Sequence, residues 1–348
     1  MILPQTSSAV LILMILSLLC LGSWAAMFKL AGRWRFELFY FNFATGLILA
    51  AVIYSFTVGN LGYDGFTFLD DLQHAGKRQW LYGFMAGLLF NFANMLLMAA
   101  VSVAGMAVAF PMAMGVAVVL STATGFASRP AGNTLLVGLG CLLLLTSVLL
   151  NAVSYRISST QRFEEYARSG HAKSTRRPNA IKGILLAVIS GLIMGSFTPL
   201  LDKARTGDLG LGPYSIVGLF AFGIFMTTPV FNVFFMNLPV AGDPVDFGAF
   251  FSSKLKQHIL GIVAGFIWCT GALAAMVAAS VPEQLQGGQV ERYVMGQGWP
   301  LIAALWGMLV FREFKGSDIR LKVMGVLMLV LYLCGLTMIA MGPLYLKT

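Results

Sequence analysis

Asn42, Asn91 and Asn94 lie inside long apolar stretches, where polar side chains are rare and costly in a membrane. Asn91 and Asn94 are three positions apart and share one face of a helix, and Asn42 lies in an earlier stretch. A neutral amide both donates and accepts hydrogen bonds, so these residues suit a polar, uncharged ligand. The same amides could instead bond neighbouring helices, and the sequence leaves both interpretations open.

Two tryptophans in separate apolar stretches, Trp24 and Trp268, could stack on a flat ring or on the face of a sugar. Either could also be a lipid-facing anchor, since indoles gather where a membrane meets water. Amides and indoles together predict a substrate-binding site. Its candidate residues are Trp24, Asn91, Asn94, Trp268, Gln289, Arg292 and Gln297.

The segment 282–293 is the most polar stretch that adjoins an apolar one. If a membrane span starts near Pro282, the polar side chains of this segment line a cavity. If the span starts at Tyr293, they belong to an exterior loop. Glu291 in this segment and Glu37 at the edge of the second apolar stretch are the candidate coupling acids.

Motifs for covalent or metal chemistry do not occur: HExxH and GxSxG are absent, and the three histidines lie in loops or at span edges. The stretch 170–175 lacks the glycine that a phosphate-binding loop places before its lysine. The four cysteines show no CxxC pairing and are predicted to be small apolar residues. We therefore expect no catalytic residue, no metal site and no cofactor. A membrane-embedded enzyme using Glu291 and Arg292 is the alternative from another class.

The elements that must position these residues are membrane-spanning helices. The chain has 348 residues, of which 58% are hydrophobic and 11% charged, and nine stretches of 19 to 50 residues carry no charge. A bilayer core needs about 20 apolar residues as a helix, so the longest stretch, 79–128, is long enough for two spans. The sequence thus predicts an all-α membrane protein with ten transmembrane helices.

The net charge of +9 comes from lysines and arginines in short loops, which indicates membrane topology and no nucleic-acid partner. Loops after odd-numbered spans hold 16 of the 23 basic residues. By the positive-inside rule these loops are cytoplasmic and both termini lie outside. The first stretch lacks the features of a cleaved signal peptide and is expected to remain as a helix.

The basic segment 155–182 divides the chain into five spans and five. A shift of 178 positions places Gly83 and Gly87 on Gly261 and Gly265, and Gly22-Ser23-Trp24 resembles Gly195-Ser196-Phe197. We expect a first repeat at 1–154, a basic cytoplasmic loop at 155–182 and a second repeat at 183–348. An odd number of spans per repeat makes the repeats inverted, which is typical of secondary transporters. A duplication that merely enlarged a membrane protein is the alternative.

Glycine spacing and two prolines predict where helices pack closely and where they break or bend. Glycines four apart, among them Gly191 and Gly195, predict close helix packing. Pro111 and Pro300 each follow an aromatic residue in the fourth and ninth spans, where they indicate either a broken helix at a substrate site or a simple kink.

Several short motifs resemble the ureide permease family, which belongs to the drug/metabolite transporter superfamily and is related to glucose/ribose and rhamnose porters. The motifs are Gly22-Ser23-Trp24, Leu49-Ala50-Ala51-Val52-Ile53, Phe56-Thr57-Val58-Gly59, Phe197-Thr198-Pro199-Leu200, Pro300-Leu301, Trp306-Gly307 and Phe311-Arg312-Glu313-Phe314. The resemblance covers nearly the whole chain. It implies a ten-helix carrier that is proton-coupled in plants and transports heterocyclic nitrogen compounds such as allantoin and uracil.

The chain departs from the plant pattern in two places. Asn42 stands where that pattern has an aspartate, and the central loop lacks a sequence like a phosphate-binding loop. Without that aspartate, Glu37 and Glu291 are the remaining candidate acids for proton coupling.

The sequence as a whole predicts a permease of the cell (inner) membrane that imports a small neutral polar solute by alternating access. Spans 1, 3, 6, 8 and 9 are expected to line the cavity. The expected partners are a small-molecule substrate, protons as the candidate coupling ion and the lipid bilayer, for a monomer or weak oligomer. A sugar porter and a multidrug or metabolite exporter of the same superfamily are the alternatives.

Overall fold

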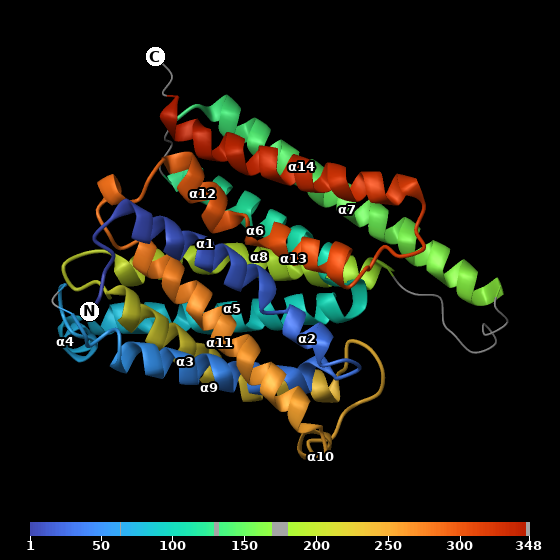
Figure 1. Ribbon diagram of the computed structural model, residues 1–348, viewed down its shortest axis with the longest axis horizontal. Helices are drawn as coiled ribbons and strands as arrows, with labels where there is room; N and C mark the ends of the chain where they lie inside the picture. The colour runs from blue at the N-terminus through green and yellow to red at the C-terminus, as the bar shows by residue number, and fades with distance from the viewer. Residues whose placement is uncertain (63, 129–131, 169–179, 346–348) are drawn as a thin grey trace. The chain divides into compact units, whose positions relative to one another are not determined.

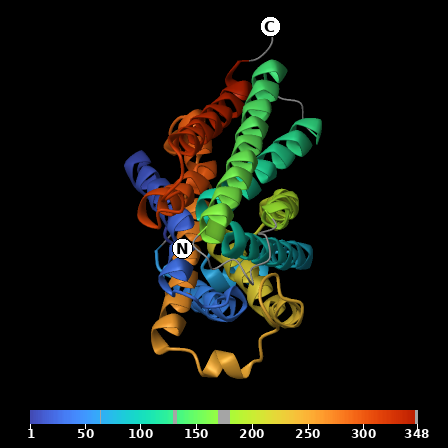
Figure 2. The same cartoon turned by 90° about the vertical axis from the view of Figure 1, so that its right-hand side faces the viewer.

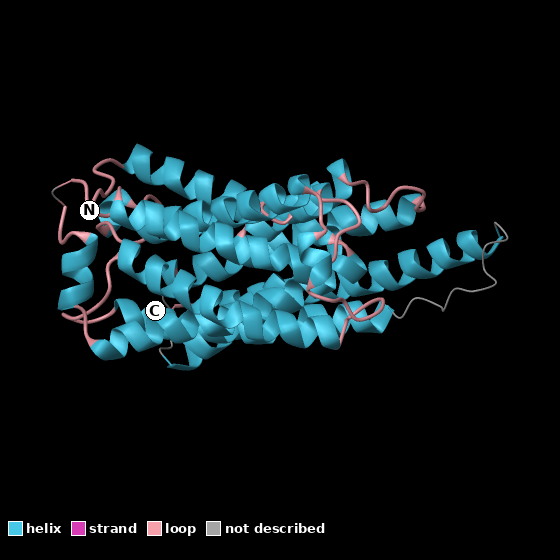
Figure 3. Cartoon of the chain, turned by 90° about the horizontal axis from the view of Figure 1, so that it is seen from below, coloured by secondary structure: helices cyan, strands magenta, loops and turns pink. Residues whose placement is uncertain are grey.

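The computed structural model describes residues 1–62, 64–128, 132–168 and 180–345. Within these ranges the chain is helical and contains no strand (Figure 3). The longer helices are α1 (Ser7–Ser23), α3 (Phe36–Phe56), α5 (Lys77–Ala104), α6 (Met106–Ser128), α7 (Thr134–Arg168), α8 (Ala180–Arg205), α9 (Pro213–Asn237), α11 (Leu255–Ala278) and α14 (Ile319–Met341). Figure 1 labels them and colours the chain from blue at the N-terminus to red at the C-terminus.

Shorter helices connect or extend these elements. They are α2 (Ala26–Leu30), α4 (Phe68–His74), α10 (Gly248–Phe251), α12 (Gln289–Gln297) and α13 (Trp299–Leu305), with single turns η2 (Glu283–Leu285), η3 (Trp306–Val310) and η4 (Gly342–Leu344). In Figure 2, α10 lies in the loop that joins α9 to α11.

The chain is a multi-pass helical membrane protein by the length and apolar character of its helices. In the described ranges nine helices could each cross a membrane, counting α1 and α2 as one. The predicted ninth span is instead a bent pair, α12 followed by α13 and η3, with an angle of 45°. Helices prevail because each satisfies its own backbone hydrogen bonds, which lipid cannot do.

The two predicted proline breaks have different outcomes. Helix α6 continues through Pro111, whereas α12 ends at Gln297 and α13 begins at Trp299, with Pro300 in its first turn. A proline near the start of a helix removes no internal hydrogen bond, which suits this position. The segment expected as a basic loop begins as helix, because α7 continues to Arg168. Residues 169–179 of that segment lie outside the described ranges.

The chain forms two compact units, each built from two separate stretches. Unit 1 contains 1–95 and 196–302, and unit 2 contains 96–195 and 303–348. The boundaries fall inside α5, α8 and α13. Each unit therefore combines helices from before and after the basic segment.

Unit 1 is held by close helix contacts at glycines. A Cβ on Gly265 of α11 would meet the carbonyl oxygen of Phe43 on α3, and one on Gly87 of α5 would meet the carbonyl oxygen of Phe220 on α9. Only a residue without a side chain permits such backbone approach. The predicted close packing is confirmed at these glycines. Helices α3 and α9 run antiparallel, since Ser55 bonds the Tyr214 carbonyl and, far along both helices, the Phe36 ring contacts that of Phe235.

Unit 2 contains an antiparallel pair, α7 and α14, drawn side by side in Figure 1. A Cβ on Gly140 would lie 2.8 Å from the carbonyl oxygen of Gly335, and a Cβ on Gly335 would lie 2.9 Å from that of Gly140. Nearby, Ser147 Oγ donates to the Met328 carbonyl at 2.9 Å. The predicted close packing is also present on α8, where a Cβ on Gly191 would meet the carbonyl oxygen of Ala113 on α6.

Candidate functional site

Six aromatic rings, five from helices and one from the turn after α1, form a largely buried cluster in unit 1, which we call the ring cluster. Its members are Trp24, Phe43, Phe90, Phe197, Phe220 and Trp268. The Trp268 indole stacks on Phe220 with centroids 5.9 Å apart and planes 4° from parallel. Such contacts stabilise the fold beyond simple area burial.

The structure brings the two predicted tryptophans together through one phenylalanine. The centroid of Phe43 lies 4.7 Å from that of Trp24 and 6.4 Å from that of Trp268. Only 1% of Trp24 and 7% of Trp268 is exposed. Neither indole is therefore the lipid-facing anchor that the sequence allowed.

Asn94 lies beside the ring cluster. Its Nδ2 donates to the hydroxyl of Tyr40 at 3.0 Å, and the Tyr40 ring lies 5.0 Å from that of Phe43. Both residues are buried. An amide and a phenol thus stand at the edge of an aromatic surface, where a flat polar ring could be recognised by stacking and hydrogen bonding together.

Asn91, one helical turn before Asn94, ties α5 to α9. Its Nδ2 donates to the carbonyl oxygen of Ile224 at 3.1 Å and to the hydroxyl of Thr227 at 2.8 Å, and its Oδ1 accepts from the hydroxyl of Thr228 at 3.4 Å. This amide is committed to helix packing, which is the second interpretation that the sequence allowed.

A further amide on α9 has no partner. Asn232 is fully buried, and neither its Nδ2 nor its Oδ1 makes a hydrogen bond in the described structure. It lies one turn beyond Thr228. A buried amide without partners is costly, so it indicates a place for a water or a polar ligand. No sequence pattern distinguishes Asn232, because the apolar stretch 209–242 also contains Asn237.

Asn42 is paired with a histidine that sequence reasoning left without a role. Its side-chain amide lies 3.0 Å from Nδ1 of His258 on α11. The imidazole also makes edge contacts with Trp34 and Phe250, at 5.5 and 4.8 Å between centroids. Asn42 directly precedes Phe43 of the ring cluster in α3, but its side chain bonds His258.

Glu37 is held in a local ion pair. It is fully buried, and its carboxylate accepts from Arg35 Nη2 at 2.8 Å and from Nε at 3.1 Å. Arg35 Nη1 also donates to the Asp243 carbonyl at 2.9 Å. A bidentate arginine fixes this carboxylate at the start of α3.

The other predicted polar residues lie on α12, which begins at Gln289, between the two starts considered from the sequence. Glu291 caps its own helix by accepting from Gly288 N at 3.0 Å, and Arg292 donates to Gln286 Oε1. Gln289 is half-buried and Gln297 exposed.

Helix α12 packs against the first half of α1, where Met295 lies against Val10 and Met14. Trp24 follows the other end of α1. The structure therefore does not bring the polar residues of α12 together with the ring cluster.

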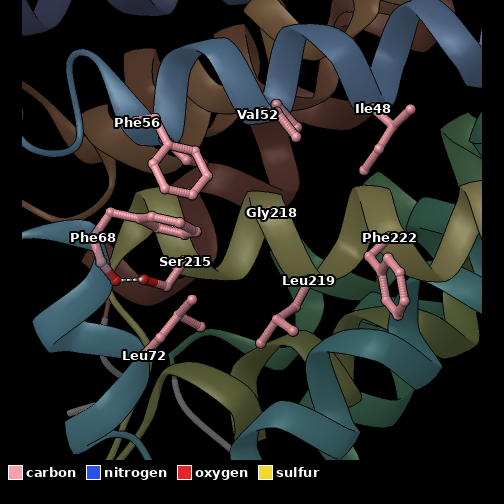
Figure 4. A pocket seen from close by; sticks show the side chains of 11 residues that line it. Ile48, Val52, Phe56, Phe68, Leu72, Ser215, Gly218, Leu219 and Phe222 are labelled. Atoms are coloured by element: carbon pink, nitrogen blue, oxygen red, sulfur yellow. Dashed lines mark hydrogen bonds between the residues drawn. The ribbon is translucent and has the colours of Figure 1, made fainter.

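Unit 1 also contains an apolar cavity that is separate from the ring cluster. It measures about 180 Å³ and lies between α3, α4 and α9, where Val52, Phe56 and Phe222 line it (Figure 4). The Ser215 hydroxyl in its wall already donates to the Phe68 carbonyl. These walls do not suit a polar ring.

Glu313 in unit 2 is a structural residue that sequence reasoning missed. Its carboxylate accepts from Met106 N at 2.9 Å and from Ala107 N at 2.8 Å, at the break between α5 and α6. Gly105, with φ +90°, makes that break. A carboxylate at a helix N-terminus satisfies donors that lack a partner within the helix.

Fold and site together define a multi-pass α-helical membrane protein with a buried aromatic and amide site. No profile of a known protein family matches the chain. Ureide permease 4 of Arabidopsis thaliana is 23% identical over 94% of this chain and 95% of its own length, and ureide permease 1 is 22% identical over 92% and 93%. The chain is a homologue of the ureide permeases, which supports the family assignment that its motifs predict.

One solved crystal structure shares the fold. It matches with a TM-score of 0.50 at 18% identity and covers 95% of this chain and 96% of its own.

Proposed function

We propose that this protein is a secondary carrier for a small, neutral, polar solute, a ureide, nucleobase or related heterocycle, and that it works by alternating access. The observation that carries the proposal is the ring cluster with Asn94 and Tyr40 at its edge, in a chain homologous to permeases over more than nine tenths of its length. The aromatic faces would stack on the solute, and the amide would bond its alternating donors and acceptors.

In this proposal the substrate-binding residues are Trp24, Trp268 and Asn94, joined by Tyr40 and Asn232. Asn91 supports them from α5 by bonding α9. Because Gln289, Arg292 and Gln297 lie on α12, they would contact the solute on its way to or from the ring cluster. Alternating access requires the cluster to open, since its rings contact one another here.

We propose ten spans in two inverted repeats, 1–154 and 183–348, joined by the segment 155–182, as in the drug/metabolite transporter fold. The bent pair of α12 and α13 supplies the tenth span. Two features support inversion. Corresponding helices run antiparallel, α3 with α9 and α7 with α14, and the ring cluster consists of residues at corresponding positions. These pairs are Phe90 with Trp268, Phe43 with Phe220, and Trp24 with Phe197, at separations of 178, 177 and 173 residues.

We place the protein in the cell (inner) membrane with both termini outside, because basic residues concentrate in the loops after odd spans. Labelling of a cysteine introduced near Thr348 with an impermeant dye tests this orientation. Labelling of intact cells is expected, and labelling only after permeabilisation would reverse it.

Transport is tested by reconstituting the purified protein in liposomes and measuring uptake of labelled allantoin, uracil and a sugar. We expect saturable uptake of a heterocycle. Uptake of the sugar alone would favour the sugar porter, and no uptake of any of the three would contradict the import proposal.

We propose Glu291 and Glu37 as the candidate coupling acids for protons. If Glu291 carries the proton, Glu291→Gln abolishes accumulation against a gradient and spares exchange of labelled for unlabelled solute. Unchanged accumulation would exclude Glu291, and Glu37→Gln repeats the test at the second acid.

A further inference from the structure

A cavity of about 410 Å³ lies in unit 2 between η3 and the first turns of α14. Three cations line it, Arg312, Lys315 and Lys322. Its remaining walls are apolar or lack a side chain, and they comprise Met308, Leu309, Phe314, Gly316, Gly325 and Val326. The cavity therefore combines positive charge with an apolar surface at one end of a spanning helix.

The acidic residues of the same loop do not neutralise these cations. The carboxylate of Glu313 accepts from the backbone of Met106 and Ala107, at the start of α6. The carboxylate of Asp318 accepts from Gln161 Nε2 at 3.0 Å. In the described ranges no side-chain hydrogen bond or ion pair joins the three cations to another residue.

The backbone of the loop separates Arg312 from Glu313. Arg312 has φ +51°, a left-handed conformation that few residues other than glycine adopt. The turn is fixed on both sides, because Phe311 N donates to Trp306 O and Glu313 N donates to Gly307 O, both at 2.9 Å. The turn thus leaves the Arg312 side chain exposed, whereas the neighbouring Glu313 carboxylate bonds the start of α6.

Apolar side chains continue from the cavity along the helices. Leu309 is 67% exposed and Val326 61%, and both belong to helices that could span a membrane. Gly325 opens the wall between them, since a Cβ there would lie 3.3 Å from Met308 Cε. A ligand that fits this surface has an anionic head beside the cations and a hydrocarbon tail along Leu309 and Val326.

We propose that this cavity is a binding site for an anionic phospholipid. The phosphate lies among Arg312, Lys315 and Lys322, and an acyl chain follows Met308, Leu309 and Val326. Basic pockets at the ends of spanning helices recognise anionic lipid head groups in this way. The site is independent of the proposed transport function and contains none of the residues assigned to the substrate.

The test is native mass spectrometry of the full-length, delipidated protein titrated with phosphatidylglycerol or phosphatidylcholine of identical acyl chains. We expect the wild-type protein to bind phosphatidylglycerol about tenfold more tightly than phosphatidylcholine. The triple variant Arg312→Gln, Lys315→Gln, Lys322→Gln is expected to lose this preference. The control variant Arg33→Gln, Lys254→Gln, Lys256→Gln, which neutralises three exposed cations of unit 1, is expected to keep it.

Two further measurements distinguish binding of the whole lipid from binding of its head group alone. Gly325→Leu fills the cavity without changing charge and is expected to weaken phosphatidylglycerol binding, with Gly325→Ala as the milder substitution if helix content by circular dichroism falls. Glycerol 3-phosphate should not displace the bound lipid. Equal binding of the two lipids, an unaffected triple variant, or displacement by glycerol 3-phosphate at lipid-like concentrations would each overturn the proposal.

Discussion

The two compact units are packed in similar ways but filled with different side chains. Both use glycines to bring helix backbones into contact, at Gly265 on Phe43 in unit 1 and at Gly140 on Gly335 in unit 2. Unit 1 surrounds its glycines with the ring cluster and buried amides. In unit 2 the α7 and α14 contact is made by small and aliphatic residues, with Leu144 and Ile339 flanking the glycines.

This difference separates packing from recognition. Close approach at glycine builds a stable helix pair in either unit, so glycine spacing alone does not mark a site. Aromatic rings and amides gathered from five helices and the turn after α1 exceed what packing requires. The ring cluster of unit 1 is therefore where substitutions should change transport, and the glycine contacts of both units are where they should change stability.

The largest effect on transport is expected from Trp268→Ala. Loss of the indole that stacks on Phe220 removes an aromatic face from the proposed site, so uptake per folded protein should fall by about tenfold or more. Trp80→Ala is the matched control, since Trp80 lies outside the ring cluster and is 40% exposed. Uptake is measured in liposomes. Equal uptake by the two variants would show that the ring cluster has no special role in transport.

The next effect concerns stability and should appear in both units. Gly265→Val and Gly335→Val force a side chain against backbone atoms, and each should lower the free energy of unfolding by about 3 kcal/mol or prevent folding. Gly125→Val, where a Cβ meets no atom within 4 Å, should have little effect. Thermal unfolding in detergent measures this. Folded Gly335→Val protein should retain the wild-type KM, and a changed KM would assign unit 2 a direct role in the substrate site.

Glu313→Gln tests the contact between the Glu313 side chain and the start of α6 in unit 2. An amide is a weaker acceptor than a carboxylate for the two N–H groups of α6, so stability should fall by about 1 to 2 kcal/mol. Uptake per folded protein should remain unchanged. The control is Glu283→Gln, at an exposed position, and a stability loss equal to that control would show that the cap contributes nothing.

The smallest effect is expected from Tyr40→Phe. Removing the phenol leaves Asn94 without its acceptor beside the ring cluster, and KM should rise by about threefold to tenfold. Tyr54→Phe is the control on the same helix, because the Tyr54 hydroxyl lies 2.8 Å from that of Thr270, away from the cluster. A matching KM change in both variants would remove Tyr40 from the site.

Much of the fold follows from local properties that a sequence displays. Absence of charge over helix-length stretches identified the spans, and glycines four apart identified helix faces that pack closely. The correspondence of span 3 with span 8 predicts equivalent packing positions for Gly87 and Gly265. These features depend on composition and on helical periodicity.

The partners of individual side chains could not be predicted in the same way. Whether Asn91 bonds a ligand or Thr227 depends on how α5 and α9 cross, which no local pattern records. The pairing of Asn42 with His258 and the use of Glu313 at Met106 join residues more than 200 positions apart. The polar segment before α13 left two interpretations open, a cavity wall or an exterior loop, because no local pattern records that α12 packs against α1.

The Glu313 contact also has a consequence for synthesis. The amides of Met106 and Ala107 leave the ribosome about 200 residues before the carboxylate that receives them. Until then the first N–H groups of α6, at its junction with α5, lack the carboxylate that caps them in the folded protein. Insertion of the early helices and completion of this joint are therefore separate events, and a nascent chain cut short of Glu313 would leave the junction open to water or to quality-control proteases.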